Sequence, residues 1–261
     1  MDLTQSLIIY NEPIANTESF YRIVLKAPEI AAAARPGQFI MLTTSPGYDP
    51  FLKRPMGINI IDREKGYIGA IYQVNGKGTQ LLTKLPAGDT MSLLGPLGNG
   101  WNIADNLRKV CLLGGGSGVA SLLPLAKTLA QMGVEIDFML GGKSKQHLIC
   151  LDEFTDLGNL LIATEDGSCG KKGLISVYFS DANQYDMVFC CGPTPMMRVA
   201  AQWAEENALP CQVSLEERMG CGYGVCVGCV CETRSTDGSV SYKRICREGP
   251  IFDAKEVFGN D

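Results

Sequence analysis

Residues 109–120 read KVCLLGGGSGVA, and this stretch decides the fold of the middle of the chain. Its first five residues are typical of a buried strand, and apolar residues at helical spacing follow the glycines, over residues 119–132. Glycines between a strand and a helix allow a tight turn and let a pyrophosphate reach the free N–H groups of the helix. The third glycine of the G-x-G-x-x-G pattern is absent, so the loop alone is equally compatible with a connection that binds nothing.

Further strands and helices alternate downstream of this stretch and predict a parallel α/β sheet. The expected strands cover 135–140, 160–164, 187–190 and 212–215, with an amphipathic segment over 175–179 and a helix over 194–207. Residues 189–197, FCCGPTPMM, read as a strand end, a turn and a helix start. Ligands of open α/β sheets bind at the carboxyl ends of strands, so we expect Cys191 to face the same crevice as the glycine loop.

Upstream of residue 100 the chain has a different character. Short β-branched and aromatic runs alternate with Pro and Gly turns, which predicts an antiparallel barrel or sandwich, with strands near 7–10, 21–25, 38–42, 58–61 and 67–74. The segment after residue 212 is rich in glycine and cysteine and carries the hairpin signal Asp237-Gly238. We therefore expect three domains, over residues 1–100, 101–212 and 213–261.

The third domain carries the most specific motif. Residues 221–229 read CGYGVCVGC, and Cys246 follows. This is the C-x4-C-x2-C…C spacing by which plant-type ferredoxins hold a 2Fe–2S cluster, so Cys221, Cys226, Cys229 and Cys246 are the predicted iron ligands. A four-cysteine zinc site is the alternative, but zinc motifs usually carry two C-x2-C pairs. An iron–sulfur cluster would mean that the protein handles single electrons.

Composition excludes several classes of function. The chain has 261 residues and a net charge of −5 without a basic cluster, which argues against a nucleic-acid partner. No run reaches the roughly 18 apolar residues that span a bilayer, and the first residues lack the features of a signal peptide. We expect no membrane association and a cytoplasmic location.

The remaining cysteines and the single histidine, His147, suggest no chemistry of their own. A reducing compartment makes disulfides improbable, and a free buried cysteine behaves as a small hydrophobe. We therefore expect every cysteine outside the motif except Cys191 to lie in the core: Cys111, Cys150, Cys169, Cys190, Cys211 and Cys231. His147 lies in a polar stretch, where a solvated side chain is expected.

Further motifs give the chain a family resemblance. They are RPMG over 54–57, GKGT over 76–79, TEDGS over 164–168 and CGP over 191–193. With these motifs the chain resembles the ferredoxin-NADP reductase superfamily over about its first 215 residues. The resemblance implies an antiparallel β-barrel that binds FAD and an α/β domain that binds NAD.

The resemblance also implies which residues bind these cofactors. The predicted FAD contacts are Arg54, Pro55, Met56, Gly57, Ile71, Tyr72, Gln73, Gly76, Gly78 and Thr79. Gly57 stands where the superfamily has Ser or Thr, so position 57 lacks the hydroxyl that would contact the flavin, and a backbone N–H is the alternative contact. The predicted NAD contacts are Gly114, Gly115, Gly116, Gly118, Asp166, Gly192 and Pro193, and Cys191 is the catalytic residue beside the nicotinamide. The residues alone do not decide between NAD and NADP, because Lys143 and Lys145 could bind the 2′-phosphate of NADP. NAD is preferred on the resemblance alone.

Within the superfamily, the whole chain resembles the electron-transfer subunits of class 1B dihydroorotate dehydrogenases, down to residues 246–252, CREGPIF. This implies an FMN-containing catalytic partner subunit, a heterotetramer with two copies of each, and electron flow from FMN through the cluster and FAD to NAD+ in pyrimidine biosynthesis. The chain has no room for a further TIM barrel of about 250 residues, so it would not oxidise dihydroorotate alone.

Three alternative functions remain, which differ from this one in the partner subunit or in the class of protein. A diaphorase subunit of a sulfhydrogenase, a sulfite reductase or a ferredoxin:NADP transhydrogenase would share the cofactors and differ in its partner. A free-standing electron carrier or redox sensor would bind no FAD. A zinc-binding interaction module would be colourless.

Overall fold

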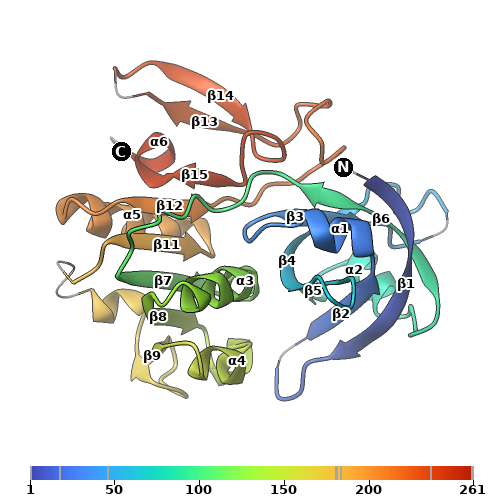
Figure 1. Ribbon diagram of the computed structural model, residues 1–261, viewed down its shortest axis with the longest axis horizontal. Coiled ribbons are helices and arrows are strands. Elements are labelled where there is room, and N and C mark those ends of the chain that lie inside the picture. The colour runs from blue at the N-terminus through green and yellow to red at the C-terminus, as the bar shows by residue number, and fades with distance from the viewer. Residues whose placement is uncertain are drawn as a thin grey trace.

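The computed structural model describes residues 2–17, 19–45, 47–179, 182, 184–235 and 237–259. Figure 1 shows a β-barrel on the right, an α/β sheet on the left and a smaller C-terminal region above the sheet. None of the helices in the described ranges is both long and apolar enough to span a membrane.

The N-terminal region is a closed six-stranded barrel with strand order β1-β2-β5-β4-β3-β6, in which all neighbouring strands are antiparallel. The strands are β1 (Asp2–Pro13), β2 (Phe20–Lys26), β3 (Phe39–Leu42), β4 (Arg54–Asp62), β5 (Tyr67–Gln73) and β6 (Thr90–Leu97). Two short helices, α1 (Pro28–Ala33) and α2 (Lys77–Leu82), connect them. The interior is filled by fully buried aliphatic side chains such as Ile23, Leu25 and Ile40. Of the two architectures that the sequence left open, the barrel is confirmed.

The middle of the chain forms a seven-stranded sheet with the order β10-β9-β8-β7-β11-β12-β15. All neighbours are parallel except β12 and β15. The strands are β7 (Lys109–Gly115), β8 (Glu135–Gly142), β9 (Asn159–Thr164), β10 (Lys171–Lys172), β11 (Met187–Cys191), β12 (Cys211–Ser214) and β15 (Ile251–Asp253). The connections include α3 (Gly118–Gln131), α4 (Leu151–Thr155), α5 (Thr194–Glu206) and the 3₁₀ helices η1 (Lys145–His147) and η2 (Ile175–Tyr178). The predicted parallel α/β sheet is confirmed, and the amphipathic segment is η2.

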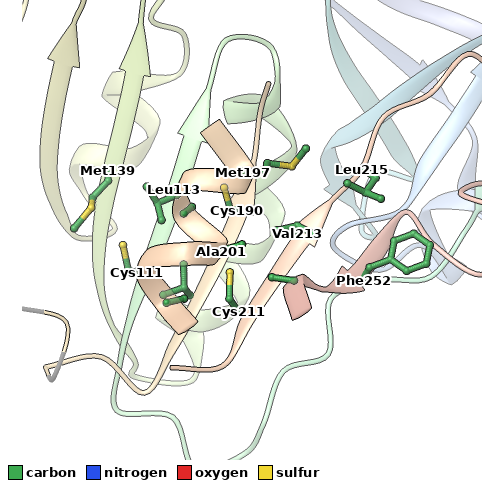
Figure 2. Packing of buried hydrophobic residues seen from close by; sticks show 14 of the residues in the cluster. Cys111, Leu113, Met139, Cys190, Met197, Ala201, Cys211, Val213, Leu215 and Phe252 are labelled. Carbon is green, nitrogen blue, oxygen red and sulfur yellow. The ribbon is translucent and has the colours of Figure 1, made fainter. Parts of the chain in front are cut away.

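Successive residues of the sheet pack on opposite faces, as the pleat requires. Val110 and Leu112 belong to the apolar core beneath α3 and α4, whereas Cys111 and Leu113 belong to the core beneath α5. Figure 2 shows Cys111, Leu113 and Cys190 on the α5 side, close to Met197 and Ala201. Because helices cover both faces, the strands read as continuous apolar runs.

The C-terminal region is built onto this sheet. Its hairpin pairs β13 (Val230–Arg234) with β14 (Val240–Arg244), and Gly238 adopts a φ of +80° in the predicted turn. The chain then returns through β15, antiparallel to β12, and ends in α6 (Ala254–Phe258). The expected boundary at residue 212 falls inside β12, so the division into three domains remains a prediction.

Two expectations about cysteine side chains are wrong, while Cys111, Cys150, Cys190 and Cys211 are buried as predicted. Cys169 is half-buried, because it lies in the exposed loop after β9, where its backbone exchanges hydrogen bonds with Thr164. Cys231 is also half-buried, because it lies on the two-stranded hairpin. Cys231 nevertheless packs against the edge of the core beneath α5.

Candidate functional site

Two of the crevices between the barrel and the sheet are lined by predicted cofactor residues. The first, called here the barrel crevice, is lined by six of the predicted flavin residues: Pro55, Met56, Gly57, Ile71, Tyr72 and Gln73. Its opposite wall comes from the start of α3 and the end of β12, through Ser117, Ser121, Ser214, Leu215, Glu216 and Glu217. The crevice therefore belongs jointly to the barrel and the sheet.

The other predicted flavin residues, Arg54, Gly76, Gly78 and Thr79, gather at the start of α2 outside the lining of the barrel crevice. The Arg54 guanidinium lies so close to Gly78 that a Cβ there would be 2.4 Å from Arg54 Nε. The Thr79 hydroxyl accepts hydrogen bonds from the backbone of Gly76 at 3.2 Å and of Asn75 at 3.1 Å. A guanidinium over a glycine turn suits a phosphate, so these residues fit the pyrophosphate of FAD.

The Tyr72 side chain packs mainly inside the barrel, although the residue also lines the barrel crevice. Its side chain is only 2% exposed, its ring stacks on Tyr21 at a centroid distance of 5.7 Å, and its hydroxyl donates to Asn11 Oδ1 at 2.8 Å. Burial raises the pKa of the Tyr72 hydroxyl, so the group stays protonated. We infer a structural role for this ring behind the flavin residues.

The second crevice, called here the sheet crevice, lies at the carboxyl ends of the parallel strands. Three of the residues predicted to contact NAD line it: Gly115, Gly116 and Pro193. Lys143, His147 and Glu165 add polar and charged groups. Gln73 lines both crevices, so the two adjoin there, as transfer between two bound cofactors requires.

The remaining predicted NAD glycines pack the strand ends against the helix starts. A Cβ on Gly118 would lie 2.6 Å from the Cys191 carbonyl oxygen, and one on Gly192 would lie 2.5 Å from Met196. Gly114 is enclosed in the same way by Val119. These three glycines allow close packing, which is one of the roles of glycine in dinucleotide-binding loops.

Asp166 is not among the residues that line the sheet crevice. Its carboxylate accepts hydrogen bonds from the backbone and the hydroxyl of Ser168, at 2.9 and 2.7 Å, and these bonds lower its pKa. The neighbouring Glu165 lines the crevice instead.

His147 also differs from its expected place in solvent. It is half-buried, lines the sheet crevice and pairs through Nδ1 with the Ser144 hydroxyl at 3.0 Å. The difference arises because η1 folds this polar stretch over the end of β8, where Gly142 contacts the histidine.

Cys191 is more deeply buried than the sequence predicts. Its side chain is 1% exposed, it ends β11 between β7 and β12, and its thiol lies next to Ser214. Burial, aided by the nearby Glu216 carboxylate, raises the pKa of the Cys191 thiol to about 12. The thiol is therefore protonated at neutral pH and covered by residues of the barrel crevice, which excludes a thiolate nucleophile in this arrangement.

Sequence reasoning missed Glu216, Ser117 and Ser121. Glu216 follows β12, the strand next to β11, so the rule that ligands bind at carboxyl ends of strands could have found it. The walls of the crevice raise the pKa of its carboxyl group by desolvation, although the side chain reaches the solvent within the crevice. No sequence pattern points to the two serines.

The four motif cysteines approach one another in two pairs. The thiols of Cys221 and Cys226 interact, and so do those of Cys229 and Cys246. In the ranges that the structure describes, no three potential metal ligands surround a single-ion position. Two pairs suit a 2Fe–2S cluster, since four thiolates shared by two irons give two to each.

Residues 221–229, called here the cysteine loop, also provide hydrogen-bond donors. The backbone N–H groups of Val225 and Cys226 lie 3.4 and 3.5 Å from Cys221 Sγ. Desolvation opposes ionisation of Cys221, but backbone donors outweigh it and lower the pKa of its thiol to about 6. Arg244 fixes the loop by donating to the Gly224 carbonyl at 2.7 Å. Such a loop fits the negative charge of an iron–sulfur cluster.

The cysteine loop adjoins the barrel crevice. Glu217 and Met219 line the crevice, and Cys221 follows Met219 by two residues. Gly222 lies against the barrel, because a Cβ there would be 2.8 Å from the Met41 side chain on β3. A cluster and a flavin bound at these places would be near neighbours.

Comparisons with known proteins agree with this arrangement. Residues 216–258 match the model of the iron-sulfur cluster binding domain of dihydroorotate dehydrogenase B. The chain is 42% identical over 223 residues to the dihydroorotate dehydrogenase B (NAD(+)) electron transfer subunit of Caldanaerobacter subterraneus, covering 85% of this chain and 86% of the relative. It is 38% identical over 243 residues to that of Bacillus caldolyticus, covering 92% and 93%.

Solved structures show the same fold. A structure of the NADH-dependent reduced ferredoxin-NADP oxidoreductase, described for flavin-based electron bifurcation, superimposes with a TM-score of 0.85 at 32% identity, covering 97% of this chain and 90% of the other. A ferredoxin reductase of carbazole 1,9a-dioxygenase gives a TM-score of 0.68 at 17% identity, covering 80% and 67%.

Barrel, sheet and cysteine loop together define an NAD-linked oxidoreductase of the ferredoxin reductase fold, with FAD and a 2Fe–2S cluster as cofactors. Within this class, the chain belongs to the family of electron transfer subunits of dihydroorotate dehydrogenase B (NAD(+)).

Proposed function

We propose that this chain carries electrons from an FMN-containing dihydroorotate dehydrogenase subunit, through its 2Fe–2S cluster and FAD, to NAD+. The barrel crevice would bind the flavin, the sheet crevice the nicotinamide cofactor, and the cysteine loop the cluster. One observation carries the proposal: the loop and the two crevices form one continuous series, because Met219 links the loop to the barrel crevice and Gln73 links the crevices.

Each part of the chain contributes binding and orientation. When bound, FAD supplies the conversion between single electrons and a hydride. Arg54 and the start of α2 would hold its pyrophosphate, and Pro55 to Gly57 and Gln73 would border its ring. The protonated Cys191 packs beneath the barrel crevice, next to Ser214, which lines it.

The surface around the cysteine loop supports a protein partner. Tyr223, Val225 and Val227 are 41%, 72% and 59% exposed, and the neighbouring Cys226 is exposed as well. Exposed apolar residues beside an electron-transfer centre are typical of a docking surface. We place the partner subunit there, in a heterotetramer with two copies of each chain, in the cytoplasm.

A second function is favoured by one specific observation. The fold match to the NADH-dependent reduced ferredoxin-NADP oxidoreductase extends over nearly the whole chain at 32% identity. The same cofactor layout could therefore serve a ferredoxin-linked partner. Identity to the dihydroorotate dehydrogenase B subunits reaches 42%, so we prefer the first function.

Co-purification with the native partner tests the choice. We expect FAD, FMN and iron in the complex, and NADH formation driven by dihydroorotate. FAD and iron with NADH-linked dye reduction, but without a response to dihydroorotate, would contradict the first function and support the second. Absence of flavin would contradict both.

A further inference from the structure

We infer that Ser121, on the first turns of α3, provides the flavin-directed hydroxyl that position 57 lacks. The inference rests on the proposed binding of FAD in the barrel crevice. Gly57 and Ser121 both line this crevice, from the barrel and from the sheet region respectively. A Cβ on Gly57 would lie 2.1 Å from Ser121 Oγ and 3.2 Å from its Cβ. The Ser121 hydroxyl thus occupies the place where a side chain at position 57 would begin.

Ser121 has no competing use for this hydroxyl within the described ranges, where the structure gives it no side-chain hydrogen bond. The side chain is half-buried at the wall of the crevice. A half-buried hydroxyl at a ligand-sized crevice can donate to or accept from a bound ring. The isoalloxazine ring carries both donors and acceptors, so the chemistry of the two groups matches.

The structure also explains how Ser121 is held in place. Pro124 lies inside α3 and has no N–H, so the Ala120 carbonyl lacks its usual helical partner. Asn59 Nδ2 donates to that carbonyl at 2.8 Å and is itself buried. Asn59 lies two residues after Gly57 on β4, and both residues meet the start of α3, Gly57 at Ser121 and Asn59 at Ala120. The proline and the asparagine together fix the helix against the barrel, one residue before Ser121.

The consequence is that one flavin contact comes from the helix that also follows the NAD glycine loop. Loss of the contact should affect FAD binding directly, so the role of Ser121 as a flavin-binding residue is visible in FAD retention and in the flavin spectrum. A hydroxyl contact of this kind corresponds to about 1 kcal/mol, or about fivefold in affinity.

Three variants of the full chain, purified as the native complex, test this inference. Ser121→Ala removes the hydroxyl. Gly57→Ala introduces a Cβ that forces the Ser121 hydroxyl out of its place. The double variant Gly57→Ser with Ser121→Ala returns a hydroxyl to strand β4. FAD retention on serial dilution, followed by flavin fluorescence, and the visible flavin spectrum are the measurements.

We expect both single variants to hold FAD about fivefold more weakly with a shifted flavin spectrum, and the double variant to return toward the wild type. Lys127→Ala, an exposed change on the same helix, is the matched control and should match the wild type. Wild-type retention and spectrum in Ser121→Ala, or a double variant as weak as Ser121→Ala, would overturn the inference. A wild-type complex without FAD would instead contradict the proposed function.

Discussion

The cysteines of the loop and those of the sheet show opposite chemistry in one chain. Around Cys221, backbone N–H groups lower the pKa of the thiol to about 6, and the neighbouring Cys226 is exposed. In the sheet, burial raises the pKa of the Cys211 thiol to about 12 and that of Cys190 well above its usual range. The difference teaches that backbone donors and solvent, more than residue type, set how readily a thiol such as that of Cys221 ionises. The predicted ligand Cys246 is itself buried, with a thiol pKa raised to about 12, so the convergence of the four motif cysteines matters as well as the pKa of each thiol.

The largest effect should come from Cys226→Ser in the native complex. Loss of an iron ligand should reduce dihydroorotate-driven NADH formation by about 100-fold or more, because electrons can no longer pass between the flavins. Reduction of an artificial acceptor by NADH should persist, since it needs only FAD. Steady-state assays of both activities give the comparison.

Cys231→Ser is the matched control for this variant, since Cys231 lies just beyond the loop and outside the motif. It should keep both activities near the wild type. Equal loss of both activities in Cys226→Ser would contradict the assignment of separate roles, in which the cysteine loop passes electrons between the flavins and the two crevices alone support acceptor reduction by NADH.

A second test removes iron with a chelator. Residues 223 and 225–228 are exposed, so the loop has few apolar contacts of its own and should depend on the metal for order. We expect proteolysis between residues 217 and 229 to accelerate by about tenfold, with the barrel and the sheet remaining intact. Mass spectrometry of the fragments locates the cleavage. Uniform cleavage along the chain would show that the sheet depends on iron as well.

The third test addresses the sheet through Asp137→Asn. Burial opposes ionisation of Asp137, but hydrogen bonds from Tyr185 at 2.7 Å, Lys109 at 3.0 Å and Asn159 at 3.1 Å outweigh it and lower its pKa. Breaking this buried network should reduce the free energy of unfolding by about 1–3 kcal/mol. Urea unfolding monitored by circular dichroism measures the loss.

The sign of the pH dependence follows from the same residue. A carboxyl group with a lowered pKa in the folded state stabilises the protein above its unfolded pKa of about 3.9, and this contribution disappears as the pH falls through the lower folded value. The wild type should therefore lose stability below about pH 4 more steeply than Asp137→Asn. Asp105→Asn, at an exposed aspartate, should keep the wild-type profile.

The smallest effect is expected from Cys190→Ala. Truncation of a small buried side chain in the core beneath α5 should cost about 1 kcal/mol of unfolding free energy. Iron content and both activities should remain unchanged, because this thiol takes no part in the cluster. Iron loss from this variant would remove the distinction between the two groups of cysteines.

Local patterns were sufficient to predict the main architecture. The apolar runs that became β7, β8 and β11 alternate with helical segments, and the β-branched runs before residue 100 are separated by turn residues. Motif residues such as Pro55 to Gly57 line a crevice because their strand places them beside the sheet.

What the sequence could not show depends on contacts between distant residues. The pairing of β15 with β12 joins segments about 40 residues apart, and no periodicity encodes it. The meeting of Gly57 with Ser121 needs the barrel to dock on α3, and the burial of Cys191 depends on its cover by Ser214 and Glu216. Each of these contacts appears only when two regions are assembled.

The return of the chain through β15 limits how this protein could be re-engineered. If residues 216–261 were removed, β12 would become the outer strand of the sheet, with the backbone groups of Gln212, Val213 and Ser214 no longer paired to β15. An uncovered strand edge of this kind recruits other chains and promotes aggregation. The iron-binding segment is therefore not an interchangeable cassette: a shortened reductase would need a new capping strand before it could be handled as a separate protein.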